Sequence, residues 1–533
     1  MILNDVSLRR RWFAAALCMT CVAAALPATA QSAFEQSLAQ LAATDPAMQA
    51  FYGASGYQPI WTGGGSLDRQ RIGALVQALD AAADHGLPAL AHDIAELETQ
   101  AAAARDSVAL AQLELAFSRT FLAYADDIQS GVLNPARTDP GILRTAPRRD
   151  PVQTLTAFAT GVPEAVLAAL PPQTEGYRRL LEEKARLEQL LDGPGWGPKV
   201  AATALAQGQS DAAVLDLRNR LAAMGYAPGD GQVFDAALTQ AVIRFQSDHG
   251  LSPDGVAGKG TLAEVNKDPA DRLTQVLIGL ERERWMNFPL GDRHVWVNLP
   301  DFTARIVDDN RVTFETRSVI GLAEAAHQSP EFSDMMEYIV VNPTWNVPRS
   351  ITVNEYLPML KADPNAVSHL QLLDEGGRVV SRAEVNFAAF DAGNFPYRLK
   401  EPPSEANALG SVKFMFPNPY NIYLHDTPSK ALFARETRAY SHGCIRLGDP
   451  HDFAHALLER QTGNAQGVFA AVLDSRRENT IKLDVPVPVH LVYNTAYRGE
   501  DGRMQYRRDV YGRDKAVWAA LQKAGVSLRA VRG

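Results

Sequence analysis

Apolar residues recur at helical spacing in the first part of the chain, from residue 31 to about residue 205. Leu75, Leu79 and Ala82 share one such face, and longer runs downstream repeat the pattern. Because side chains three or four positions apart lie on one side of an α-helix, the pattern predicts packed amphipathic helices. The glycine- and proline-rich stretch at 192–198 is typical of a break or linker. We therefore predict a helical scaffold domain over residues 31–205.

Residues 211–267 form a second, compact unit with two further helical faces. Leu217 and Leu221 share the first face, and Leu238 and Phe245 share the second. Turn-forming residues follow, and a last short stretch predicts a third small helix. The spacing therefore predicts a separate domain of three small helices.

The periodicity becomes strand-like from about residue 270. After a helix at Leu273–Arg284, short apolar or alternating stretches predict β-strands, with a hairpin turn at Glu500–Gly502. Many short strands with little helix favour a sandwich-like or barrel-like β-domain, which we place at 270–520, followed by a C-terminal tail at 521–533. The predicted strands are Val295–Leu299, Phe302–Val307, Val312–Ile320, Tyr338–Val341, Val412–Phe416, Asn421–Leu424, Val468–Leu473, Val489–Tyr497 and Met504–Tyr511.

An irregular stretch interrupts these strands between Asn342 and Gly410. Within it, Thr352 and Glu355 have the spacing of a capping box, which predicts the start of a helix at Thr352. Long insertions inside compact domains usually carry function, often as a lid. We therefore predict a capping insertion at about 342–410.

The N-terminal segment has the three parts of a secretory signal peptide. Three arginines precede an apolar run from Trp12 to Leu26, and the small-x-small sequence Ala28–Ala30 follows. The run is shorter than the about 20 residues of a membrane-spanning helix, so a membrane anchor is the weaker alternative. We therefore predict that residues 1–30 are a cleaved signal peptide and that the exported protein has no membrane span.

Composition argues against a disulfide scaffold and against nucleic-acid binding, and the positions of the cysteines leave one thiol in the exported protein. Three cysteines in 533 residues exclude a disulfide scaffold, and a formal charge of -9 offers no basic field to a nucleic-acid backbone. Cys18 and Cys21 lie in the predicted leader, so Cys444 alone would remain after cleavage. A single thiol in an exported protein indicates either a reactive group or a buried, inert cysteine.

The residues near Cys444 favour the reactive alternative. His425 precedes it in Tyr-Leu-His-Asp-Thr-Pro, and His442 and Gly443 lie beside it in Ser-His-Gly-Cys. A thiolate nucleophile needs a base, or a cation that lowers its pKa, and histidine supplies either near neutral pH. Glycine permits close approach of a substrate, and the neighbouring amides can donate hydrogen bonds to a developing oxyanion. The pattern predicts covalent catalysis by a cysteine.

The spacing from His425 through fifteen residues to Ser441-His442-Gly443-Cys444 resembles the signature of L,D-transpeptidases. Residues 211–267 resemble a peptidoglycan-binding module, and further segments resemble the large Gram-negative subfamily of these enzymes. That resemblance implies a multidomain protein with a helical scaffold, a small three-helix peptidoglycan-binding domain and a mainly-β catalytic domain with a lid. The segments of the catalytic domain that carry it are Asn342–Pro343, Trp345–Pro348, Ala408–Gly410, Lys413–Pro417, Tyr423–Pro428 and Tyr506–Arg513.

The resemblance also implies a mechanism. Cys444 would attack the bond between diaminopimelate and D-alanine in a tetrapeptide stem, with His425 as the base. The backbone carbonyl of Asp426 would orient that base, and the amides of Gly443 and Cys444, with His442, would stabilise the oxyanion. The amine of a second stem would take the acyl group and form a 3→3 cross-link. No cofactor and no metal are implied.

Substrate-binding residues are less sharply defined. Arg446 suits a bidentate contact with a substrate carboxylate, although an internal ion pair is an equal alternative. Trp345 suits a wall of the cleft, although a tryptophan is more often packing. The further candidates for substrate contact are Ser441, Tyr423, Tyr338 and Arg398.

The resemblance implies a periplasmic enzyme of cell-wall organisation and cell shape, open to acylation by carbapenems. Its partners would be peptidoglycan stem peptides, glycan strands and other cell-wall enzymes, and not nucleic acid. Three alternatives stay open. With another acceptor, the same nucleophile would give a hydrolase or a protein-anchoring enzyme. The second alternative is a non-catalytic wall-binding scaffold. The third is a zinc site formed by His425, His442 and Cys444.

Overall fold

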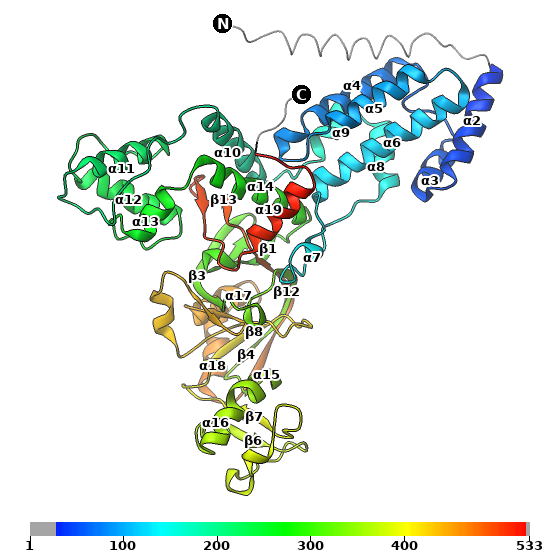
Figure 1. Cartoon of the computed structure of the whole chain (residues 1–533). Coiled ribbons are helices and arrows are strands. Elements are labelled where there is room, and N and C mark those ends of the chain that lie inside the picture. The colour runs from blue at the N-terminus through cyan, green and yellow to red at the C-terminus, as the bar shows by residue number, and fades with distance from the viewer. Residues whose placement is uncertain (1–27, 529–533) are drawn as a thin grey trace. The chain divides into compact units, whose positions relative to one another are not determined.

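The computed structural model describes residues 28–528, which divide into two compact units (Figure 1). The first unit comprises residues 28–140, 144–288 and 494–528. The second comprises residues 141–143 and 289–493. Nearly all of the predicted signal peptide, and residues 529–533 of the predicted tail, lie outside the described residues.

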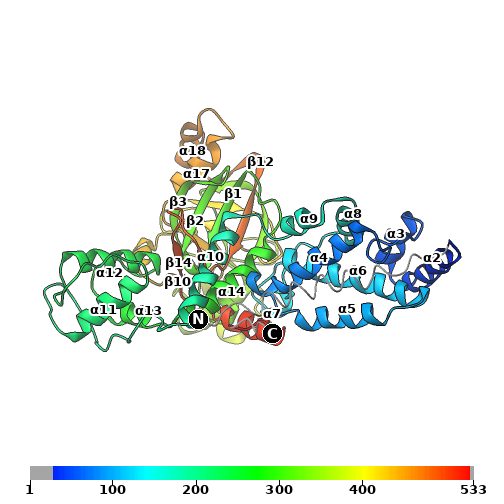
Figure 2. The same cartoon turned by 90° about the horizontal axis from the view of Figure 1, so that it is seen from above.

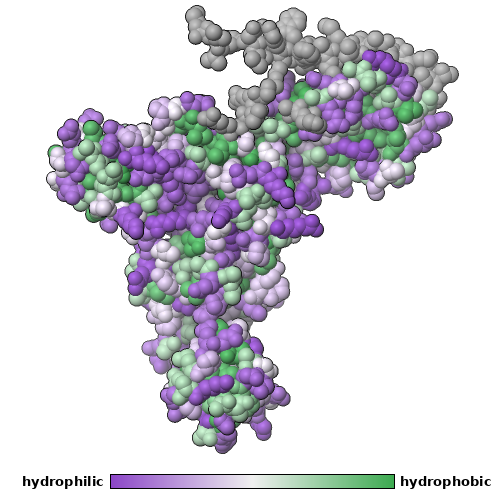
Figure 3. Space-filling model, viewed as in Figure 1, coloured by the Kyte–Doolittle hydropathy of each residue, from purple (hydrophilic) through white to green (hydrophobic). Residues whose placement is uncertain are grey.

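The first unit is mainly helical, as the apolar spacing predicts. Its scaffold core buries Trp61 against Phe117 and Phe158, with ring centroids 5.4 Å and 5.1 Å apart. Figure 3 shows hydrophilic side chains intermixed with hydrophobic ones on the visible face of these helices. Within residues 28–528, no helix is both long and apolar enough to cross a membrane. The helices of this region are α2 (Ala28–Ala42), α3 (Pro46–Ala54), α4 (Ser66–Asp80), α5 (Ala91–Ala103), α6 (Ser107–Ser130), α7 (Pro135–Thr138), α8 (Pro151–Thr160), α9 (Pro163–Ala169) and α10 (Glu175–Leu191).

Three small helices follow with a core of their own: α11 (Ala212–Ala223), α12 (Ala236–Asp248) and α13 (Lys259–Val265). The same unit contains α14 (Pro269–Trp285), the hairpin of β13 (Ala496–Arg498) and β14 (Met504–Tyr506), and α19 (Arg513–Lys523). Arg503 of the hairpin loop donates to the Asp248 carboxylate at the end of α12, over 2.9 Å. Residues 494–520 and α14 therefore fold with the first unit and not with the β-domain predicted at 270–520.

The second unit is built on one nine-stranded sheet, in the order β10-β3-β11-β9-β8-β4-β12-β1-β2. Because β2 also pairs with β3, the pairings close into a ring, which makes the predicted β-domain barrel-like. Figure 2 shows β3, β2, β1 and β12 side by side. The strands are β1 (Arg293–Asn298), β2 (Thr303–Asp308), β3 (Arg311–Gly321), β4 (Phe332–Val341), β8 (Val412–Met415), β9 (Leu424–His425), β10 (Ala439–Ser441), β11 (Ile445–Leu447) and β12 (Asn479–Val492).

Two helices lie between β11 and β12, and one of them corrects a sequence prediction. Residues Val468–Leu473, predicted as a strand, belong to α18 (Ala465–Asp474), which follows α17 (Pro450–Glu459). A short apolar run fits a buried strand and a buried helix equally well. The Asn464 side chain accepts from the Gly467 amide over 3.0 Å and begins the helix as its N-cap.

The insertion between β4 and β8 folds around its own small core. It has a three-stranded sheet, β5 (Trp345–Asn346), β7 (Arg398–Glu401) and β6 (Gln371–Leu373), with a helical segment of α15 (Arg349–Ile351), a π-helical turn (Thr352–Tyr356) and α16 (Leu357–Ala362). We call this insertion the cap. The predicted capping box is wrong, because Thr352 lies inside the helical segment and the Glu355 side chain instead contacts His442.

Candidate active site

The register of three neighbouring strands places the predicted catalytic side chains on one face of the sheet. In the parallel β9–β11 pair, Arg446 lies opposite His425, and in the antiparallel β8–β9 pair, Lys413 lies opposite His425. Side chains alternate along a strand, so Tyr423 and Cys444 project to the same side as their neighbours two residues on. The alternate residues Leu424, Ile445 and Leu447 are fully buried in the core. The core thereby fixes the strands that carry the site.

His425 is buried at the end of β9, and its ring is oriented by the main chain. Its Nδ1 atom lies 2.5 Å from the backbone carbonyl oxygen of Asp426. Burial, with the positive charges of Arg446 and Lys413, lowers the pKa of His425 to about 3. The imidazole is therefore neutral near pH 7, with the Nδ1 proton donated to the carbonyl. Its Nε2 atom keeps a lone pair and can accept a proton.

The Asp426 carboxylate anchors the turn that presents this carbonyl. It accepts hydrogen bonds from the Ser411 amide and hydroxyl, each over 2.8 Å, from the Thr427 amide over 2.7 Å and from Lys430 over 2.6 Å. Burial alone would raise the pKa of Asp426, but the hydrogen bonds from Lys430 and Ser411 outweigh it and lower that pKa. The carboxylate is thus fully engaged in positioning its own backbone.

Cys444 immediately precedes β11 and is a half-buried free thiol. Its Sγ atom lies 3.5 Å from the Asn421 carbonyl oxygen, to which it can donate. Burial raises the pKa of Cys444 to about 11, although hydrogen bonds from Tyr423 and the charges of Arg446 and Lys413 act in the opposite direction. The thiol and the imidazole are therefore both neutral in the resting site. Nucleophilic attack then requires transfer of the thiol proton to a base.

Gly443 shapes the backbone next to the thiol. Its φ of +114° lies in a region that side chains disfavour, and an added Cβ would come within 3.3 Å of Ile422 Cδ1. The Ser329 hydroxyl donates to the Gly443 carbonyl oxygen over 2.7 Å and accepts from the Gly321 amide over 2.9 Å. Ser441 is buried at the end of β10, where its carbonyl oxygen accepts from the Leu322 amide over 2.8 Å. The loop that carries Cys444 is therefore held by hydrogen bonds from the segment 322–329.

His442 connects this loop to the cap. Its Nε2 atom lies 2.9 Å from Glu355 Oε1, and its ring meets that of His327 edge to face, with centroids 4.7 Å apart. One ligand atom from each of these three residues lies within 4.8 Å of the others, a donor set that can bind divalent cations. This trio differs from the predicted metal alternative of His425, His442 and Cys444.

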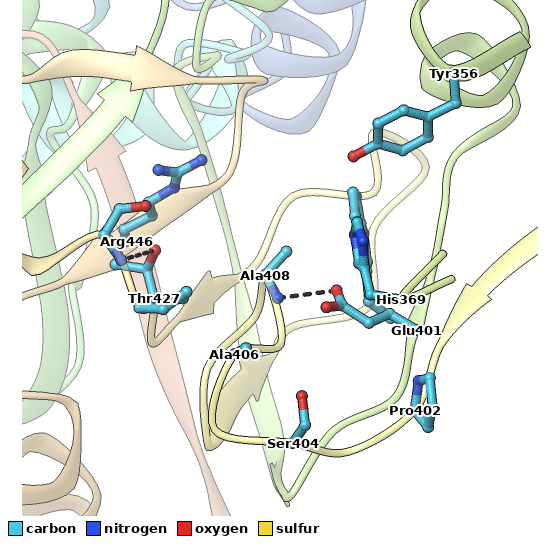
Figure 4. Close-up of a pocket in the computed structure, with 12 residues that line it drawn as sticks. Tyr356, His369, Glu401, Pro402, Ser404, Ala406, Ala408, Thr427 and Arg446 are labelled. Carbon is cyan, nitrogen blue, oxygen red and sulfur yellow. Dashed lines mark hydrogen bonds between the residues drawn. The ribbon is translucent and has the colours of Figure 1, made fainter. Parts of the chain in front are cut away.

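A cavity of about 600 Å³ lies between the cap and the strand ends (Figure 4). Arg446 and Trp345, both predicted substrate contacts, line it. Sequence reasoning missed Tyr356, His369 and Glu401 on the cap side, because nothing in their local sequence marks them as functional. The full lining is Trp345, Tyr356, His369, Glu401, Pro402, Ser404, Ala406, Ala408, Thr427, Pro428, Ser429 and Arg446.

The other predicted substrate contacts lie outside this lining. Tyr338 lies within β4, opposite Met415 of β8. Arg398 is exposed on β7, and its guanidinium donates to the Glu375 carbonyl oxygen over 3.1 Å, within the cap. Tyr423 is half-buried beside the thiol, with Lys413 Nζ 5.8 Å from its ring centroid. Tyr423 thus interacts with the nucleophile, whereas Arg398 forms its hydrogen bond within the cap.

Three regions of the chain match models of known families. Residues 292–468 match the model of the L,D-transpeptidase catalytic domain, which includes the site just described. The chain contains an L,D-transpeptidase catalytic domain. Residues 46–183 match the "Scaffold domain", and residues 210–264 match the "Putative peptidoglycan binding domain". These three matches bear out the family resemblance of the sequence motifs.

Two individual proteins are also similar. A Haemophilus influenzae protein named "Putative L,D-transpeptidase" is 32% identical over 247 residues, which are 46% of this chain and 49% of the relative. The match thus spans about half the length of that relative. A solved structure of an L,D-transpeptidase (residues 123–326) from Xylanimonas cellulosilytica matches 55% of this chain and 99% of its own, with 15% identity and a TM-score of 0.17.

Proposed function

We propose that this protein is a peptidoglycan L,D-transpeptidase that forms 3→3 cross-links through a cysteinyl thioester. The observation that carries the proposal is a buried, neutral His425 on β9, whose Nδ1 proton is held by the Asp426 carbonyl, with the Cys444 thiol immediately before the neighbouring strand β11. The family match of residues 292–468 supports the reaction class, and the match of residues 210–264 supports peptidoglycan as the substrate. A peptidoglycan substrate in turn implies a periplasmic location and the predicted signal peptide.

The acylation step uses the site residues in defined roles. His425 Nε2 accepts the thiol proton while Cys444 Sγ attacks the carbonyl carbon between diaminopimelate and D-alanine. The amides of Gly443 and Cys444, with His442, would stabilise the resulting oxyanion. When the tetrahedral intermediate collapses, the carbon–nitrogen bond breaks and His425 returns the proton to the leaving amine of D-alanine. The products are a thioester on Cys444 and free D-alanine.

The second half-reaction reverses these proton movements. The diaminopimelate amine of a second stem attacks the thioester carbonyl and gives a proton to His425. The carbon–sulfur bond then breaks, and the departing sulfur of Cys444 recovers the proton. The new amide has the energy of the amide that was broken, so the cycle needs no nucleotide. Water in place of the amine would give hydrolysis, and a protein amine would give anchoring.

Product analysis with tetrapeptide-bearing muropeptides tests this proposal. Wild-type protein should release D-alanine and form dimers whose mass corresponds to one 3→3 bond, and Cys444→Ala should form none. Shortened monomers without dimers would contradict cross-linking and favour a hydrolase. Unchanged products in Cys444→Ala would contradict the nucleophile. The absence of products with both proteins would favour a non-catalytic wall-binding scaffold.

A further inference from the structure

Arg446 brings a positive charge to the cavity without a counter-charge. Among residues 28–528, no carboxylate lies within ion-pair distance of its guanidinium, and its buried Nε atom has no hydrogen-bond partner. The groups that it influences electrostatically are Cys444 and His425, both neutral in the resting site. A partly buried cation without an anion costs free energy. The Arg446 side of the cavity can therefore bind an anionic group of a ligand.

Glu401 brings the opposite charge to the cap side of the same cavity. The residue is 4% exposed, and its Oε2 atom accepts a hydrogen bond from the Ala408 amide over 3.0 Å. Within the described part of the chain, no lysine or arginine lies within ion-pair distance of this carboxylate. One amide donor leaves most of the acceptor capacity of a carboxylate unused. The Glu401 side of the cavity can therefore bind a cationic hydrogen-bond donor of a ligand.

The two charges face the same space but do not neutralise each other. Figure 4 shows the Arg446 guanidinium on one side and the Glu401 carboxylate, bonded to Ala408, on the other. Both residues line the cavity of about 600 Å³, yet they do not form an ion pair. A ligand with a single charge would leave one of these two groups unpaired, and a neutral ligand would leave both unpaired. A ligand that carries an ammonium and a carboxylate group would satisfy both.

We propose that Arg446 and Glu401 form a subsite for the free α-amino-acid end of a stem peptide. Arg446 binds the carboxylate of this end, and Glu401 binds its ammonium group. The inference rests on the proposed function, because diaminopimelate has such a zwitterionic end on the carbon outside the peptide chain. A stem with lysine at that position has the amine without the carboxylate. The subsite thus selects the third residue of the stem by its two charges.

Binding measurements on the full chain with Cys444→Ala, which prevents turnover, test this subsite. The probes are the tetrapeptide L-Ala-γ-D-Glu-meso-diaminopimelate-D-Ala, the same peptide with the free amine acetylated, and the same peptide with the free carboxylate amidated. Adding Glu401→Gln should weaken the parent peptide at least about tenfold and leave the acetylated peptide unchanged. Adding Arg446→Gln should weaken the parent peptide similarly and leave the amidated peptide unchanged. Calorimetry gives each Kd.

Matched variants control for charge and folding. Glu405→Gln removes an exposed charge from the same cap segment, and Arg435→Gln removes an exposed charge from the loop before β10. Neither should change any Kd. Glutamine at 401 still offers an oxygen to the Ala408 amide, so the cap should keep its thermal transition.

Three results would overturn the subsite: equal weakening of all three peptides, no weakening of any, or no binding of the parent peptide to Cys444→Ala. Its failure is distinguishable from failure of the proposed function. If wild-type protein forms 3→3 dimers while the charge variants keep the parent Kd, the subsite alone is wrong. If wild-type protein forms no dimers, the cross-linking proposal is wrong as well.

Discussion

His425 Nδ1 donates to the backbone carbonyl oxygen of Asp426 over 2.5 Å, and not to a carboxylate. This carbonyl fixes the tautomer of the ring. Burial and the charge of Arg446 lower the pKa of His425, and they outweigh this hydrogen bond and the charge of the Asp426 carboxylate, which both raise it. The balance of these effects holds the imidazole neutral. The base is therefore available over a wide range of pH, and it becomes cationic only after it accepts a proton.

The pH profile of acylation should show this neutral base. Because the pKa of His425 is lowered to about 3, the rate should fall only as the pH approaches about 3, well below the ordinary histidine range near 6.5. Single-turnover release of D-alanine, followed by mass spectrometry from pH 7 downward, gives the acid limb. Circular dichroism at each pH separates this limb from acid unfolding. A limb near pH 6.5 in folded protein would show that the base is not held neutral.

Asp426→Asn should impair catalysis although the carboxylate takes no part in the chemistry. The four donors that converge on the carboxylate come from Ser411, Thr427 and Lys430, and an amide offers one acceptor oxygen in place of two. We expect a loss of about 1–3 kcal/mol in stability and a fall in kcat. Thermal unfolding and steady-state kinetics measure the two effects. A matched control is Asp452→Asn, which changes an exposed carboxylate on α17 and should alter neither.

The local sequence pattern was sufficient to predict the catalytic residues but not the residues that line the cavity. Short-range signals identified Cys444 and His425, and the parallel pairing of β9 with β11 explains why residues so close in sequence share one face. Glu401 reaches the same cavity through the register of the cap sheet, where it lies opposite Trp345. No periodicity encodes that long-range placement. Two predictions were wrong for the same reason: the strand at 468–473 and the helix start at Thr352. Both depend on tertiary contacts that a short stretch of sequence does not contain.

Gly443→Ala should reduce activity more than stability. An alanine would have to keep a φ of +114° or move the loop, and its Cβ would come within 3.3 Å of Ile422. A shift of about 1 Å at the nucleophile costs on the order of 100-fold in rate. Gly463→Ala is the control, because that position has no atom within 4 Å of the added Cβ. Equal kcat/KM for the two variants would contradict a special role for the Gly443 backbone.

The contact between Glu355 and His442 should couple the cap to the catalytic loop. Glu355→Ala removes the partner that lies 2.9 Å from His442 Nε2, while the edge-to-face contact with His327 remains. We expect a several-fold lower kcat/KM with little change in thermal stability, because both side chains are partly exposed. Asn354→Ala, an exposed change in the same helical turn, is the control. Indistinguishable kinetics of the two variants would show that the loop does not need this contact.

Alkylation of Cys444 should reveal a thiol that is protonated at rest. Because burial raises its pKa to about 11, the rate of reaction with iodoacetamide should increase about tenfold per pH unit from pH 7 to pH 10. In denaturant the same cysteine should react faster at pH 8 and level off near its ordinary pKa. Peptide mass spectrometry resolves Cys444 from Cys18 and Cys21. His425→Ala should change the native rate at pH 7 little, because the imidazole does not deprotonate the thiol before substrate binds. A plateau below pH 8 that disappears in His425→Ala would instead indicate a preformed thiolate–imidazolium pair.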